Sequence, residues 1–186
     1  MQIKKVNNWA ILLALIAAVS LTLINCGGKN PTGPTPLNVD LSGILTGSGI
    51  PDAADYIPGP GLHPIAVFGA IPTTAIPDEW LAKSVSTLEL VAHGIEGRLL
   101  IETCTYFPYG TIQRYSRVFK VDLYAAKSAV IVASETFISA PPPECPSSDF
   151  FEPGEVKMYL ADPVPIQTIV DWLEGFVTGP ESHTGE

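Results

Sequence analysis

The stretch RYSRVFKVDLYAAKSAV, residues 114–130, contains the clearest strand pattern in the chain. Apolar side chains recur there at every second position, which is typical of a strand with one buried face. They are Tyr115, Phe119, Val121 and Leu123, and Arg117 interrupts them. The polar residues Arg114, Ser116, Lys120 and Asp122 would lie on the other face. The pattern predicts a half-buried strand, followed by a turn at residues 125–128.

Three further strands are expected around this one. Residues 85–92 and 98–107 flank the sequence HGIEG, whose two glycines predict a hairpin connection. Residues 129–138 form another apolar segment after the turn. Because these strands follow one another with short connections, they favour an antiparallel meander.

The C-terminal part of the body has a helical period. Its apolar residues recur at three- and four-residue spacings and would share one helix face. They are Ile166, Ile169, Val170, Leu173, Phe176 and Val177. Pro165 suits the first turn, and Gly179 follows the end. The polar face carries no Lys or Arg, so we expect packing on the sheet and not a membrane-surface helix, which is usually basic.

The expected fold class is α+β, an antiparallel meander with a C-terminal amphipathic helix on one face. Residues 40–80 are dense in Pro and Gly, which excludes a long helix. We expect this region to wrap the core as irregular chain, with one strand at 65–68. A single globular domain is expected over residues 40–178, followed by a polar tail at 179–186.

An apolar segment precedes the body. It runs from Ala10 to Ile24, has 15 residues and follows Lys4 and Lys5. A membrane-spanning helix needs about 20 apolar residues, whereas the apolar part of a secretory signal needs about 7–15. The length therefore predicts an export signal over residues 1–25, with a short membrane anchor as the alternative.

The sequence LINC, residues 23–26, resembles the lipobox of bacterial lipoproteins. Leu23, three positions before Cys26, matches that pattern, whereas Asn25 departs from the usual Gly, Ala or Ser. The resemblance implies cleavage before Cys26, diacylation of its thiol and acylation of the new amino terminus, with palmitate as a typical chain. An ordinary signal peptide followed by a coincidental cysteine is the alternative.

Residues 26–39 contain almost no side chain that could be buried. Their Gly, Pro and Thr content predicts a flexible tether. A lipid and a tether imply a protein anchored to a membrane on the extracytoplasmic side of the cell envelope. Removal of Lys4 and Lys5 would leave 8 basic and 19 acidic residues, a net charge of −11. That charge opposes binding to nucleic acid.

Two cysteines remain when Cys26 is assigned to the lipid. An even pair in an exported protein predicts a disulfide between Cys104 and Cys145. Neither belongs to a C-x-x-C motif, so a zinc or redox site is not indicated. The alternative is that Cys104 is a nucleophile, with His63 or His93 as its base.

Eight short motifs follow one another within residues 45–178. They are GSGIPDAADY, HPI, DEWL, LELV, CTYF, RYSRVFKVDLYAAKSAV, PPPECP and WLEGFV. Their order resembles an uncharacterised domain family of bacterial extracytoplasmic lipoproteins and membrane proteins. The resemblance implies an envelope module with paired cysteines, and it carries over no catalytic residue.

The sequence contains no recognised catalytic or metal motif. There is no G-x-S-x-G and no H-E-x-x-H, and His93 with Glu96 offers only two potential ligands. We therefore expect no metal or cofactor, and a binding or structural module with an envelope protein or glycan as partner. Candidate contact residues are the aromatics Tyr56, Trp80, Tyr106, Phe107 and Tyr109. The alternative is a small hydrolase with two Asp or Glu carboxyls about 5–10 Å apart.

Overall fold

A computed structural model describes residues 37–179. The predicted signal peptide, Cys26, most of the tether and nearly all of the polar tail lie outside the described residues. In the described part of the chain, no helix combines the length and the apolar character needed to cross a membrane.

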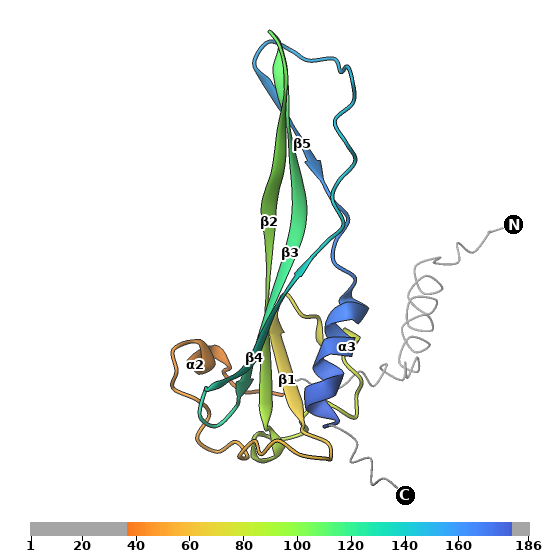
Figure 1. Cartoon of the computed structure of the whole chain (residues 1–186). Helices are drawn as coiled ribbons and strands as arrows, with labels where there is room; N and C mark the ends of the chain where they lie inside the picture. Colours follow the sequence, from red (N-terminus) through yellow and green to blue (C-terminus); the bar gives the residue numbers. More distant parts are fainter. Residues whose placement is uncertain (1–36, 180–186) are drawn as a thin grey trace, which may run out of the picture. The chain divides into compact units, whose positions relative to one another are not determined.

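Five strands form one mixed sheet (Figure 1). They are β1 (Ile65–Gly69), β2 (Leu90–Tyr106), β3 (Gly110–Ala125), β4 (Ile131–Ile138) and β5 (Glu155–Leu160). The order is β1-β2-β3-β4, and β5 also pairs with β3. The β2–β3 and β3–β4 pairs are antiparallel, whereas β1 is parallel to β2 and β5 is parallel to β3. With the C-terminal helix this is an α+β fold, but its sheet is mixed and not antiparallel throughout.

Strand β2 is one continuous strand of 17 residues, so the hairpin predicted at 93–97 is wrong. Both glycines of that segment lie inside the strand. A Cβ at Gly94 would meet the side chains of Ile71 and Phe119, so this glycine serves close packing and not a turn. The chain reverses instead between Tyr106 and Gly110, where β2 ends and β3 begins. Residues expected to begin a strand form the short 3-10 helix η2 (Val85–Thr87).

Strand β3 is longer than predicted because two strands share its second edge. Residues 110–115 pair with β5, and residues 118–124 pair with β4. The β2–β3 hairpin therefore continues past the ends of β1 and β4 (Figure 1). We call residues 95–117 and 139–160 the arm, and the other described residues the base.

The base buries apolar side chains on both faces of the sheet. Helix α3 (Ile166–Val177) covers one face, and its buried residues are Ile169, Val170, Leu173 and Val177. The predicted helix is thus confirmed, with Phe176 partly buried against the same core. The other face packs on helix α2 (Ser42–Leu45) and the chain around it, which contributes Ile44, Ile50 and Ala53.

Candidate interaction surface

The outer edge of β2 is unpaired along the arm. Strand β1 ends opposite Gly94, and beyond that point β2 pairs only with β3 among the described residues. On the β1 side, the Leu90 N–H donates to the Pro64 carbonyl, and the Gly94 carbonyl accepts from the Ala70 N–H. Alternate residues of a strand direct their backbone groups to the same edge. The backbone groups of Glu96, Arg98 and Leu100 therefore lie on the free edge and can pair with another strand.

The loop between β4 and β5 covers the β3 side of one face of the arm. Arg114 is buried there and donates from Nη2 to the Pro142 carbonyl (2.6 Å) and from Nε to the Pro143 carbonyl (2.8 Å). It also forms an ion pair with Glu102. At the outer end, the Tyr106 hydroxyl donates to the Pro146 carbonyl at 2.6 Å. Polar contacts thus hold a proline-rich loop against the sheet.

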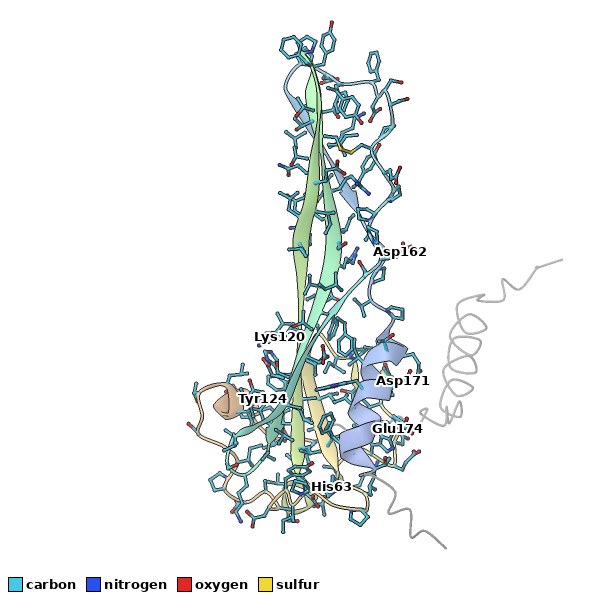
Figure 2. All side chains as sticks on the ribbon, viewed as in Figure 1. His63, Lys120, Tyr124, Asp162, Asp171 and Glu174 are labelled. Atoms are coloured by element: carbon cyan, nitrogen blue, oxygen red, sulfur yellow. A yellow bond between two sulfur atoms is a disulfide. The ribbon has the colours of Figure 1, made fainter. Side chains whose placement is uncertain are left out.

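A disulfide joins Cys104 of β2 to Cys145 of the same loop, with their Cα atoms 6.4 Å apart. It is the yellow bond in the arm in Figure 2. The predicted pairing is confirmed, and Cys104 has no free thiol to act as a nucleophile in this structure. The two histidines considered as its base, His63 and His93, both lie in the base; Figure 2 labels His63 there.

The other face of the arm is uncovered. Alternation along β3 from Phe119, which packs in the α3 core, places Arg117, Tyr115 and Gln113 on this face. Across it, Leu100 lies opposite Tyr115, and Tyr115 lies opposite Leu160. Exposed apolar side chains continue outward along β5, at Met158 and Val156. Helix α3 stops short of these positions, so apolar side chains remain in contact with solvent.

Two arginines on this face lie directly opposite each other, Arg98 on β2 and Arg117 on β3. Like charges at opposed positions destabilise a sheet. Arg98 lies over the ring of Tyr115, 5.8 Å from its centroid, and its Nη1 is 3.1 Å from the Met158 sulfur. Arg117 donates from Nε to the Ala161 carbonyl at 3.1 Å. Within residues 37–179 neither arginine has a carboxylate partner, whereas Arg114, Lys120, Lys127 and Lys157 each have one.

An open hollow of about 300 Å³ borders the two arginines. It is lined by Glu96, Gly97, Arg98, Arg117 and Leu160. The hollow therefore combines two guanidinium groups, one carboxylate and an apolar wall.

The hairpin tip carries three of the five aromatics singled out from the sequence. Phe107 is 92% exposed and Tyr109 57% exposed, and Tyr106 packs on Phe151 with ring centroids 4.9 Å apart. A Cβ at Gly110 would meet the ring of Phe151, so the close approach requires glycine. A hollow of about 230 Å³ lies beside these residues.

The other two aromatics are in the base and are not at the tip. Trp80 is 8% exposed and belongs to the α3 core. Tyr56 is partly buried against that core and packs edge-on to His63, with ring centroids 5.0 Å apart. Trp80 and Tyr56 thus pack in the base, since an aromatic residue at a core position cannot be told by composition from one at a contact surface.

His63 ties the segment before β1 to the start of β2. Its Nδ1 lies 2.7 Å from the Glu89 carboxylate, and its Nε2 lies 3.0 Å from the Gly59 carbonyl. Burial opposes the charged imidazole and is the largest effect, but the hydrogen bonds to Glu89 and Gly59 together raise the pKa of His63 above its usual value. This arrangement serves stability, since His63 and Glu89 line none of the hollows described above.

The main surface hollows of residues 37–179 hold no pair of carboxylates. Four surface hollows in this part of the chain contain at most one acidic side chain each. Asp122 is buried and is held by Lys120 at 2.8 Å and Ser134 at 2.6 Å. Burial would raise the pKa of Asp122, but these two hydrogen bonds and the nearby charges lower it overall. The geometry therefore gives no support to the hydrolase alternative.

Sequence reasoning missed the paired arginines and the free edge. Arg98 and Arg117 are distant in sequence, and only the register of β2 against β3 shows that they are neighbours.

No family model, curated protein or solved structure matches the chain. The lipobox and the resemblance of the body to an envelope domain family thus stay predictions.

Proposed function

We propose that this chain is a lipid-anchored extracytoplasmic binding module, and that the arm is the surface that contacts its partner in the cell envelope. The observation that carries this proposal is the free edge of β2 beside an uncovered, partly apolar sheet face. Soluble proteins usually protect such edges and faces, because they pair readily with other chains. In this protein the free edge and the uncovered face both belong to the arm, whose loop is held in place by a disulfide and by the buried Arg114.

The anchoring half of the proposal is supported by the N-terminal sequence. The apolar segment has the length of an export signal, Leu23 and Cys26 match a lipobox, and a segment rich in Gly, Pro and Thr follows. Stable anchoring takes two or more acyl chains, which a diacylated thiol would supply. Mass spectrometry of the mature amino terminus should find an acylated Cys26. An unmodified Cys26, or a chain that still begins at Met1, would contradict lipid anchoring.

The binding half can be tested by site-specific photo-crosslinking in the cells that produce the protein. A benzoylphenylalanine residue at Phe107 would probe the tip of the arm. The matched control is the same residue at Ile57, which is 73% exposed in the base. We expect a discrete cross-linked product from position 107 and none from position 57. Cross-links from both positions or from the base alone, or no product from the arm, would contradict the assignment of the contact surface.

A further inference from the structure

The chemistry of the arm identifies one class of partner more closely. We propose that the free edge of β2 at residues 95–100 accepts an extended peptide strand that carries an acidic side chain, and that Arg98 and Arg117 bind its carboxylate. This rests on the proposed function, because it assumes that the arm is the contact surface. It adds the binding mode and the chemistry of the ligand.

The length of the docking segment is set by two features of β2. On one side, β1 occupies the edge as far as Gly94. On the other side, the register against β3 shifts between Leu100 and Glu102, as in a β-bulge. A bulge disrupts regular pairing and turns the edge. Residues 95–100 are therefore the regular part of the edge that is free to pair with an added strand.

The arginines determine the charge of the peptide. An added strand places one side chain directly opposite Arg98 on the uncovered face, where cross-strand Cβ atoms lie about 4.5–5.5 Å apart. Arg117 is one strand further, within reach of a long side chain. Two like charges opposite each other are unfavourable until an anion neutralises them, and the guanidinium group matches a carboxylate in a two-point hydrogen bond. The body is otherwise acidic, so these two guanidinium groups contrast with their surroundings.

A singly charged carboxylate fits the site better than a phosphate does. Glu96 lines the same hollow and would repel a doubly charged group more strongly. Leu100 lies two positions from Arg98 on the same face of β2 and can contact an apolar residue two positions from the acidic one. The free backbone groups of Glu96, Arg98 and Leu100 match an extended peptide main chain, which is the basis of strand addition.

A second copy of this chain does not fit the edge. Antiparallel self-pairing that sets Glu96 against Arg98 would place Leu100 of one copy opposite Gly94 of the other. That position on the edge already belongs to β1. The register centred on Arg98 would set the arginines of the two copies directly against each other, and like charges at opposed positions are unfavourable. Registers centred further out would run across the irregularity between Leu100 and Glu102. A peptide segment of a different protein is thus the favoured occupant.

The test uses the full chain in a non-ionic detergent and a capped peptide, Thr-Val-Thr-Glu-Thr-Val-Thr. This sequence reads the same in both directions, so it tests parallel and antiparallel addition together. Backbone amide NMR and hydrogen exchange are recorded during titration. We expect the amides of Glu96, Arg98 and Leu100 to shift and become protected. The amides of Gly97 and Leu99 already face β3 and should change less.

Four controls separate the contribution of the carboxylate–arginine contact from that of the backbone pairing. A peptide with Gln in place of Glu should bind about tenfold more weakly or worse, as should the Glu peptide to the Arg98→Gln/Arg117→Gln variant. The Lys83→Gln variant loses a positive charge in the base and should bind as the unmodified protein does. A peptide N-methylated at every residue should not bind, because neither of its edges can donate a backbone hydrogen bond to β2.

The inference is overturned if no amide on the free edge shifts at about 1 mM peptide. It is also overturned if the Glu and Gln peptides bind equally, or if the changes lie elsewhere in the protein. These outcomes are separate from a failure of the proposed function, because cross-linking from Phe107 reports contact by the arm whatever the chemistry of the partner.

Discussion

Cys104, near the outer end of β2, is bonded to Cys145, in the loop that covers one face of the arm. The bridge spans a sequence separation of 41 residues. Cross-links over loops of this length limit the freedom of the unfolded chain and typically stabilise the fold by about 2–4 kcal/mol. The bridge therefore keeps one face of the arm covered, while the opposite face remains free.

Replacement of both cysteines by serine should lower the free energy of unfolding by about 2–4 kcal/mol. Chemical denaturation of the full chain under oxidising conditions measures this change. A strong reductant should destabilise the unmodified protein by a similar amount and leave the double variant unchanged. Equal stability of the variant and the unmodified protein would show that the loop is held without the bridge.

Arg114 should also stabilise the loop between β4 and β5, through hydrogen bonds and not through a covalent bond. The Arg114→Leu variant leaves the carbonyls of Pro142 and Pro143 without their donor, and each buried unpaired group costs about 1–3 kcal/mol. Lys127→Gln is the control, because Lys127 pairs with Asp55 on the surface of the base. An exposed pair contributes about 0–1 kcal/mol. A loss for Arg114→Leu no larger than that of the control would mean that the loop does not depend on this arginine.

Helix α3 could be predicted from the sequence because it has one buried face. Strand β3 was predicted as half-buried, but Arg114, Ser116 and Asp122 on its polar face are buried as well. Apolar residues recur at alternate positions of β3 from Phe119 to Leu123 and at every third or fourth position of α3, and burial in the base explains both periods. The arm lacks this signal along β2. Its residues 95–103 are exposed on both faces, so their mixed composition resembles a connection.

The glycines of β2 misled the prediction for a physical reason. Glycine marks a turn when the backbone needs a positive φ, but it also allows two chain segments to approach closely. Gly94 serves the second purpose, between Ile71 and Phe119. The candidate site was accordingly predictable only in part. Composition was enough to select Phe107 and Tyr109 as candidate contact residues and to predict the disulfide. The pairing of the two arginines could not be predicted, because it depends on the register of β2 against β3.

Helix α3 should be essential to the base. Leu173 is fully buried in the core between the helix and the sheet. The Leu173→Ala variant should lower the free energy of unfolding by about 2–5 kcal/mol, the range for a buried leucine. Glu174→Ala, on the exposed side of the same helix, should cost far less. An unchanged melting temperature for Leu173→Ala would show that the helix is peripheral.

Stability should also depend on pH through His63. Because the pKa of His63 is raised in the folded protein, the folded state binds a proton more tightly than the unfolded chain. Its contribution is fully present below the unfolded pKa, about 6.5, and is lost as the pH rises through the folded pKa. The free energy of unfolding should fall across that window and lose this dependence in His63→Gln. If the free energy of unfolding of His63→Gln keeps the same pH dependence, a group other than His63 is responsible for it.

The most direct measurement of the central claim is hydrogen–deuterium exchange of the full chain with and without envelope membranes from the producing cells. Our account predicts slower exchange in the free edge and tip, residues 95–109, when the membranes are added. The exposed base segment at residues 57–62 should exchange at the same rate in both samples. Protection confined to the base, or no protection in the arm, would contradict the assignment of the arm as the contact surface.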